Sequence, residues 1–232
     1  GFNFIALICK RNSAVFFDVF LFKIIEQMYT IFINDKPLIL ISYKTKYINK
    51  KSYLIEEFKN EKIIDLSINE LKNEKSEGKV ILGTNLNKLY KLVLKRFKLI
   101  RAAGGIVKYK NSILCIFKNN KWDLPKGKID LKESEEKAAY REVLEETGLK
   151  YVNVNKYLSS TYHSYLESGE MVLKITYWYS MECKKMSILK PQVDEGITKV
   201  QWIELSKLPS LNTYSSIVEL LKREKVLNFL HF

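Results

Sequence analysis

The chain has 232 residues, a mass of 27.3 kDa and a formal net charge of +13. Hydrophobic residues make up 47% and charged residues 28%, which excludes disorder by composition and allows one large domain or two small ones. No apolar run reaches the roughly 18 residues of a membrane span, and three scattered cysteines exclude a disulfide framework and indicate a reducing, cytoplasmic compartment.

The positive charge raises the question of nucleic-acid binding, but the residue types argue against it. Five of the 39 basic residues are Arg, whereas bidentate recognition of phosphate and guanine favours Arg over Lys. An RNA-binding module would therefore rest on charge alone, and we expect no stable nucleic-acid partner and no membrane association. A positive field that steers polyanionic substrates fits the same charge.

Residues 1–27 differ from the rest of the chain. They begin with Gly and crowd six Phe residues with little polar alternation, and the apolar run at 14–25 lacks the cleavage site of a secretory signal. A different residue pattern starts at Met28. We predict that the native start is Met28 and that the preceding residues are upstream translation or an artefact of expression. A membrane-surface anchor is the alternative.

The remaining pattern divides near residue 98, and residues 28–97 form a predicted small α/β region. Its first elements are strands at 29–33 and 38–41, which flank the turn cluster Asn-Asp-Lys-Pro at 34–37 and predict a hairpin. The role of this region stays open from the residues alone: it could cover a substrate cleft or form a homodimer contact.

Helical signals follow in the same region. Residues 51–60 are a predicted helix, and Ser67 with Glu70 has the capping-box spacing that would start a second, short helix. A strand is expected at 80–82. Asn85 is then the predicted N-cap of an amphipathic helix, whose apolar residues recur at helical spacing.

The second part, residues 98–232, alternates strands with one long helix and ends in helical segments. Gly148 stands where a C-terminal helix glycine belongs. The predicted elements are strands at 103–109 and 113–118, a helix at 134–147, strands at 156–162, 173–182 and 199–203, and helical segments within 206–229.

The helix at 134–147 carries a pattern that points to chemistry. Glu142, Glu145 and Glu146 stand at i, i+3 and i+4, so that three carboxylates share one face. Like charges at this spacing repel, and the arrangement becomes favourable when hard divalent cations such as Mg²⁺ or Mn²⁺ take oxygen ligands from it. The backbone carbonyl of Gly127 could supply a further ligand, because a glycine allows close approach of the backbone.

A second pair belongs to the same pattern. Arg141, on this helix, can pair with Glu133 from the preceding loop and hold that loop over the helix. The plainer interpretation is a Glu- and Lys-rich surface helix. It leaves the fixed spacing of nine constrained positions unexplained.

The whole pattern is identified as a Nudix box, and the chain resembles the Nudix hydrolase family over about residues 98–205. The matching positions are Gly127, Glu133, Arg141, Glu142, Val143, Glu145, Glu146, Gly148 and Leu149. The resemblance implies an α/β/α sandwich around a mixed sheet. It also implies divalent-metal-dependent cleavage of a nucleoside diphosphate linked to another group, by attack of water on phosphorus.

The resemblance also assigns roles by position. Gly127, through its carbonyl, Glu145 and Glu146 are expected metal ligands, and Glu142 is a ligand or the base that activates water. Glu133 and Arg141 are the expected structural pair. Family members often take another carboxylate from a later loop.

The later carboxylate is predicted before the last strand. Glu195 is the candidate for this ligand or base, and Asp194 is the alternative.

The expected substrate is a small nucleoside polyphosphate. The segment Trp-Asp-Leu-Pro-Lys-Gly-Lys at 122–128 resembles the entry to the box in hydrolases of dinucleoside polyphosphates. Lysines would meet the phosphates, and tyrosines could stack on a base. The candidate substrate contacts are Lys126, Lys128, Tyr162, Lys174 and Tyr177.

Other functions stay open within the resemblance. ADP-ribose, nucleotide sugars, oxidised nucleotides and the 5′ end of RNA are rival substrates of the same chemistry. A different class is a non-catalytic nucleotide or ADP-ribose sensor built on a Nudix domain. Such sensors often have an eroded box, and the box in this chain is intact.

Overall fold

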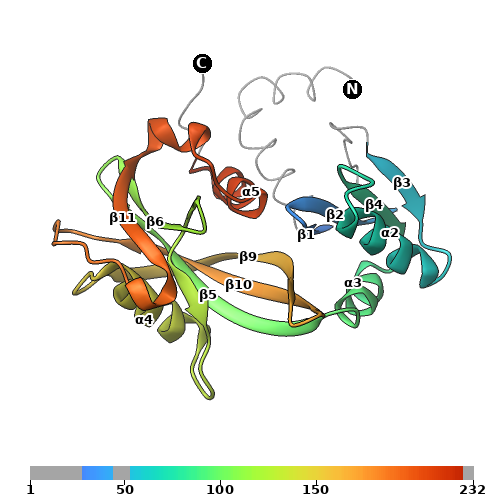
Figure 1. Cartoon of the computed structure of the whole chain (residues 1–232), viewed down its shortest axis with the longest axis horizontal. Coiled ribbons are helices and arrows are strands. Elements are labelled where there is room, and N and C mark those ends of the chain that lie inside the picture. Colours follow the sequence, from blue (N-terminus) through green and yellow to red (C-terminus); the bar gives the residue numbers. More distant parts are fainter. Residues whose placement is uncertain (1–27, 44–52, 227–232) are drawn as a thin grey trace, which may run out of the picture. The chain divides into compact units, whose positions relative to one another are not determined.

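The structure is a computed structural model that describes residues 28–43 and 53–226 (Figure 1). Over these residues no helix combines the length and the apolar character that crossing a membrane requires. The prediction for residues 1–27 lies outside the described residues.

Strands and helices alternate along the described chain. The strands are β1 (Met28–Ile33), β2 (Lys36–Ser42), β3 (Leu54–Glu57), β4 (Lys79–Gly83), β5 (Lys98–Tyr109), β6 (Ser112–Lys118), β7 (Lys121–Asp123), β8 (Lys126–Lys128), β9 (Asn153–Glu167), β10 (Glu170–Glu182) and β11 (Ile197–Glu204). The helices are α2 (Lys62–Lys72), α3 (Leu86–Leu94), α4 (Glu135–Thr147) and α5 (Ser215–Arg223), with 3₁₀ turns η1 (Val193–Glu195) and η2 (Leu205–Ser210).

Contacts divide the chain into two compact units. One unit joins Ile31–Lys36 to the chain from Phe97 onward, and the other contains Pro37–Arg96. The short segment Ile31–Lys36, which lies within the predicted N-terminal region, thus packs with the second part of the chain.

In the first unit, β2, β4 and β3 form a parallel sheet with β4 in the middle. The predicted helix at 51–60 is wrong where the structure describes it, because Leu54–Glu57 is the edge strand β3. Its Ile55 pairs with Val80 of β4. Pairing with the neighbouring strand β4 makes this segment a strand, and the local spacing of residues does not reveal such pairing.

The capping-box prediction at Ser67 is also wrong. Helix α2 begins at Lys62, so Ser67 lies inside the helix and is fully buried. The start of the helix is marked instead by Asn60, whose side-chain oxygen accepts a hydrogen bond from the Lys62 amide (3.0 Å). In contrast, the predicted cap of α3 is confirmed, because Asn85 accepts from the Lys88 amide at 2.9 Å.

The second unit contains a mixed sheet with the strand order β11-β6-β5-β10-β9-β1. Strand β10 runs parallel to β5 and antiparallel to β9, and β1 joins β9 in parallel. The short strand β8 pairs with β5, and β7 pairs with β6. The predicted strands of this part and the mixed sheet are confirmed.

Helices α4 and α5 cover opposite faces of this sheet (Figure 1). Because strand residues alternate between faces, Val107 of β5 packs with Val143 of α4, whereas neighbouring Ile106 packs with Leu220 of α5. The fully buried Trp178 lies on the α5 side. The α/β/α layering expected from the resemblance is therefore present.

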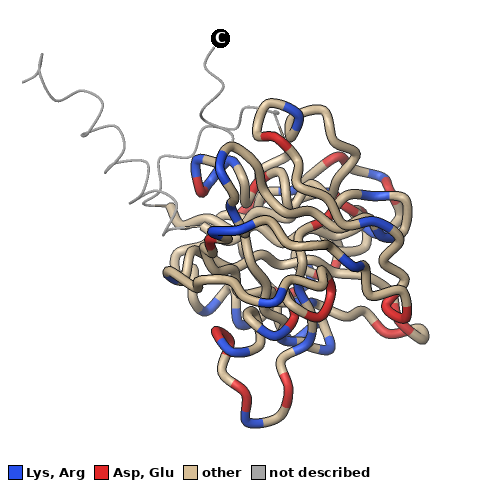
Figure 2. The backbone as a smooth tube through the Cα atoms, turned by 90° about the vertical axis from the view of Figure 1, so that its left-hand side faces the viewer, with Lys and Arg blue, Asp and Glu red and all other residues tan. Residues whose placement is uncertain are grey.

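Charged residues are dispersed rather than gathered. Figure 2 shows Lys and Arg interspersed with Asp and Glu along the described backbone. Basic residues are thus not confined to one segment of the described chain.

Candidate active site

Helix α4 begins and ends as its sequence predicts. The Ser134 hydroxyl accepts a hydrogen bond from the Lys137 amide (3.3 Å), and Gly148 ends the helix in the left-handed conformation with φ of 75°. Ala138, Ala139 and Val143 are fully buried against the sheet. These contacts fix the register of α4 and point its acidic face toward β8.

Arg141 is the centre of a network that holds the preceding loop onto α4. Its Nε and Nη2 donate to the two carboxylate oxygens of Glu133 at 3.0 and 2.8 Å, and Nη2 also donates to the Lys128 carbonyl at 3.0 Å. Its Nη1 donates to Glu142 at 2.7 Å and to Glu145 at 3.0 Å. The hydrogen bond from Arg141 lowers the pKa of Glu133. The fork geometry of a guanidinium makes this arrangement possible.

Gly127 and Glu142 pack so closely that any side chain at position 127 would displace the Glu142 carboxylate. A Cβ atom on Gly127 would fall within the carboxylate of Glu142, far inside the 3.0 Å below which real Cβ contacts essentially never occur. The Glu142 side chain is 12% exposed, and burial raises its pKa. The missing side chain of Gly127 therefore makes room for a buried carboxylate.

Glu146 lies deeper, one helical turn beyond Glu142. It is 4% exposed, and its carboxylate accepts a hydrogen bond from the Lys126 amide at 2.8 Å. Burial raises the pKa of Glu146 to about 7, and the charges of Asp123 and Glu142 act in the same direction. Two acidic groups with raised pKa values thus lie beside the backbone of β8.

Glu195 comes from the turn η1, before β11. The charge of its carboxylate adds to those that raise the pKa of Glu142, after burial and the charge of Glu145. It also pairs with Lys118 at 3.3 Å, with 58% of its own side chain exposed. Asp194, the alternative, has no described contact with this group.

The acidic group fits a hard cation in donor type. Gly127 offers a carbonyl, and Glu142, Glu145 and Glu146 offer carboxylates, the oxygen ligands that Mg²⁺ and Mn²⁺ prefer. Over residues 28–43 and 53–226, however, no three Asp, Glu, His or Cys side chains converge on one point. Glu142 and Glu145 accept hydrogen bonds from the Arg141 guanidinium, which offsets part of their charge, and Glu146 accepts one from the Lys126 amide.

The predicted substrate contacts are divided between the two faces of the sheet. Lys174 of β10 is the strand partner of His163 of β9 and lies on the α5 face. Lys126 and Lys128 of β8, the partners of Gly104 and Ala102 of β5, lie on the same face. Tyr162 and Tyr177 lie on the opposite face. Tyr177 packs against the core beneath α4, where the Arg101 guanidinium lies 5.3 Å from its ring centroid.

A cluster of charged and aromatic side chains surrounds the lysines on the α5 face. The Lys126 ammonium forms an ion pair with Asp123, whose side chain is only 11% exposed. Burial opposes the charge of Lys126, but Asp123 raises its pKa overall. Burial and the neighbouring charge of Lys126 lower the pKa of Lys174, whose ammonium lies 5.7 Å from the centre of the Tyr165 ring.

Two further members of this cluster were not among the predicted contacts. Asp123 stands within the Trp-Asp-Leu-Pro segment, but a single sequence does not show that it holds Lys126. His163 lies between Tyr165 and Tyr214, with ring-centroid distances of 6.4 and 5.7 Å. Within the described part of the chain its buried Nδ1 has no hydrogen-bond partner, and burial lowers its pKa.

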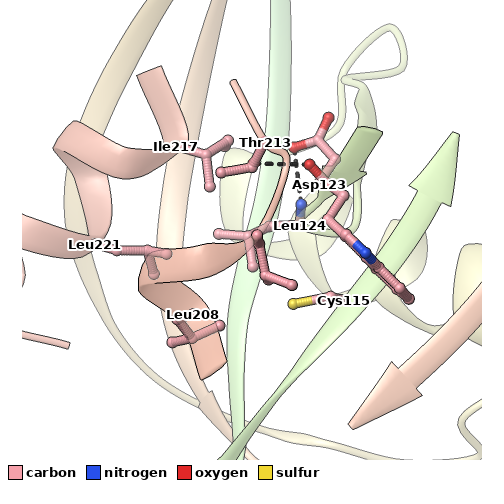
Figure 3. Close-up of a pocket in the computed structure, with 9 residues that line it drawn as sticks. Cys115, Asp123, Leu124, Leu208, Thr213, Ile217 and Leu221 are labelled. Atoms are coloured by element: carbon pink, nitrogen blue, oxygen red, sulfur yellow. Dashed lines mark hydrogen bonds between the residues drawn. The ribbon is translucent and has the colours of Figure 1, made fainter. Parts of the chain in front are cut away.

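A small pocket next to this cluster has a structural role. Figure 3 shows Leu208, Ile217 and Leu221 facing Cys115 and Leu124 across it. These apolar side chains belong to the core on the α5 side. The pocket therefore marks where α5 seats on the sheet.

Comparison with known proteins identifies the family. A family model for the NUDIX domain matches residues 98–223, more than half of the chain. The chain belongs to the NUDIX family. The recognition made from the nine residues of the box, which run from Gly127 in β8 through α4 to Leu149, is thus confirmed.

Similar proteins match part of the chain. A protein of Mycobacterium tuberculosis named as a mutator protein, MutT4, is 32% identical over 94 residues, which are 40% of this chain and 37% of that protein. The match thus spans little more than a third of this relative.

Solved structures are similar over somewhat more than half of the chain. A C. elegans Ap4A hydrolase binary complex is 20% identical and covers 56% of this chain and 98% of its own, with a TM-score of 0.45. The MutT protein from Methanosarcina mazei is 20% identical, covering 57% and 96%, with a TM-score of 0.46. The NUDIX domain of Shewanella oneidensis NrtR with ADP ribose is 18% identical, covering 60% and 95%, with a TM-score of 0.45.

Proposed function

We propose that this Nudix protein is a divalent-metal-dependent hydrolase that cleaves a phosphoanhydride bond in a nucleoside diphosphate linked to another group. The observation that carries the proposal is the fit of the Glu142 carboxylate into the space that Gly127 leaves free, beside the buried Glu146. Burying a carboxylate in this way does not stabilise a surface helix, because desolvation of the charge is unfavourable. A cation held between helix and loop would compensate that charge.

The acidic group would hold Mg²⁺ or Mn²⁺. The Gly127 carbonyl, Glu145 and Glu146 are the proposed ligands, and Glu142 is a ligand or the base. A bound cation of this kind lowers the pKa of water and neutralises charge that develops on the phosphate. Arg141 then has a positioning role, because its bonds to Glu133 hold the loop that carries Gly127 onto α4.

The chemistry of the residues follows from these positions. Water attacks phosphorus, the bond from phosphorus to the leaving oxygen breaks, and a carboxylate takes the proton of the water. Glu142 suits this role because burial raises its pKa and so increases its affinity for a proton. Glu195, whose charge acts on Glu142, is the second candidate base or ligand.

The proposed substrate is a dinucleoside polyphosphate. Lys126 is close enough to the acidic group for the charge of Glu146 to raise its pKa, and Lys128 and Lys174 lie on the same face of the sheet as Lys126. Lys174 is half-buried, and a desolvated cation there favours an anionic ligand. The Trp-Asp-Leu-Pro-Lys-Gly-Lys segment supports this substrate class by its resemblance. Tyr162 and Tyr177 stay candidate contacts for a base, on the face of the sheet that α4 covers.

The test measures phosphate and nucleotide release in Mg²⁺ or Mn²⁺. The panel contains diadenosine polyphosphates, ADP-ribose, nucleotide sugars, oxidised dGTP and triphosphorylated RNA. Glu146→Gln should abolish turnover. Glu136→Gln removes the same charge from an exposed position of α4 and should leave turnover unchanged.

Each outcome decides a different part of the proposal. Metal-dependent turnover of diadenosine polyphosphates supports the hydrolase and its substrate. Preferred turnover of ADP-ribose or another member of the panel overturns the substrate class but keeps the chemistry. Absence of turnover together with tight binding of one nucleotide overturns the hydrolase and favours the sensor.

A further inference from the structure

The turn between β1 and β2 reaches the start of α5, although it lies outside the matched Nudix domain. Asn34 and Asp35 form this turn with φ values of 48° and 63°, the left-handed conformation that a two-residue hairpin turn requires. Both residues belong to the same compact unit as α5. Strand β1 reaches this place by pairing with β9, where Phe32 is the partner of His163.

Asp35 supplies what the start of α5 lacks. The N-cap residue Tyr214 makes no side-chain cap hydrogen bond. One carboxylate oxygen of Asp35 accepts a hydrogen bond from the Ser215 amide at 2.7 Å, although the two residues are 180 positions apart. A carboxylate at the N-terminus of a helix satisfies a free amide and interacts favourably with the helix dipole.

The second carboxylate oxygen of Asp35 organises the neighbouring side chains. It pairs with the Lys121 ammonium at 3.1 Å, and that ammonium lies 4.6 Å from the centre of the Tyr214 ring. The Tyr214 ring meets His163 edge to face at 5.7 Å. Asp35 thus fixes both the backbone and the aromatic ring at the start of α5.

This assembly borders the lysine cluster of the proposed substrate site. The charges that face His163 come from Asp35, Lys126, Asp123 and Lys174. Tyr214 is likewise close enough to Lys126 to influence its ionisation. A shift at the start of α5 would therefore be felt by the groups proposed to meet the phosphates.

We propose that Asp35 is a positioning residue that pins the start of α5, and with it Tyr214, against His163 beside the substrate lysines. The inference rests on the proposed function for its effect on turnover. It gives part of the region before the Nudix domain a role that the sequence left open: its first turn completes the substrate side of the site.

The test uses the full chain with Asp35→Ala and Asp35→Asn. Glu170→Ala is the matched control, because it removes a carboxylate from the same unit whose ion pair with Lys98 is 3.5 Å long and mostly exposed. Hydrogen exchange at the Ser215 amide and the imidazole NMR signals report the positioning directly. The chain has two histidines, which makes His163 simple to assign. Turnover is followed with diadenosine tetraphosphate and Mg²⁺.

We expect Asp35→Ala to speed exchange at Ser215 about fivefold, the effect of losing a typical helix cap, and to shift the His163 signals. KM should rise about fivefold while kcat stays within about twofold, because no group of the acidic site is touched. Asp35→Asn keeps a neutral acceptor, so exchange should return toward the wild-type rate. The His163 titration should move to lower pH in both variants, because both remove the carboxylate charge.

Unchanged exchange at Ser215 and unchanged His163 signals in Asp35→Ala would overturn the proposal, as would a fall in kcat without a rise in KM. If Asp35→Ala does not fold, Asp35→Asn decides through the His163 titration. Exchange and NMR need no turnover. If the wild-type protein does not hydrolyse diadenosine tetraphosphate, the proposed substrate fails while the role of Asp35 is still tested.

Discussion

Replacement of Gly127 by Ala tests the geometry on which the proposed chemistry depends. The new Cβ would occupy the position of the Glu142 carboxylate, and the carboxylate would have to retreat before ordinary contact at 3.4 Å is reached. The carboxylate cannot retreat freely, because its side chain is 12% exposed and one oxygen accepts a hydrogen bond from Arg141 at 2.7 Å. The substitution therefore acts on the position of Glu142 more than on folding.

The expected magnitude follows from the displacement. Moving a catalytic group by about 1 Å costs on the order of 100-fold in rate, which is about 2.7 kcal/mol of transition-state stabilisation. We expect Gly127→Ala to lower kcat by this factor in Mg²⁺-dependent hydrolysis of the best substrate of the panel. The thermal midpoint should change little, because the displaced atoms are the end of a side chain.

A double-mutant cycle isolates the cause. In a Glu142→Ala background the clash is absent, so Gly127→Ala should add less than about threefold to the loss. Gly83→Ala is the control, because Gly83 belongs to the other compact unit and its Cβ would meet Leu89 at 3.2 Å and Phe58 at 3.9 Å, and no acidic side chain. Additive losses, or a Gly127→Ala enzyme with wild-type kcat, would refute the reasoning.

Three further predictions concern stability and metal binding. Arg141→Lys keeps the charge but loses the bidentate contact with Glu133, so the free energy of unfolding should fall by about 1.5–3 kcal/mol, seen as a lower midpoint in thermal unfolding; an unchanged midpoint would contradict the structural role. Asn85→Ala removes the side chain that caps α3 and should cost about 1 kcal/mol, with kcat unchanged. Saturating Mn²⁺, at about 100 times its Kd, should raise the free energy of unfolding by about 2.7 kcal/mol in the wild type and by much less in Glu146→Gln; equal stabilisation of both by calorimetry would exclude Glu146 as a ligand.

Short-range patterns in the sequence were sufficient for the catalytic helix. Ser134, Gly148 and the carboxylates of α4 act within one or two helical turns, so the spacing alone predicted the bounds of the helix and the face that carries the acids. The same holds for Asn85 and α3. Where a residue's partner lies a few positions away, the backbone geometry of the helix decides the contact.

Long-range pairing decided the rest. Leu54–Glu57 became a strand because β4 offers a parallel partner, and Ser67 is buried inside α2, where a start was predicted. Alternation along the strand already separates Lys174 from Tyr177, but only the sheet shows that α5 covers the face of Lys174 and α4 that of Tyr177. Asp35 meets Ser215 across 180 positions, and no local spacing predicts such a contact. The sequence by itself determined the chemistry of the Nudix box, and only the tertiary structure decided which distant residues surround it, because contacts across the sheet depend on register and packing.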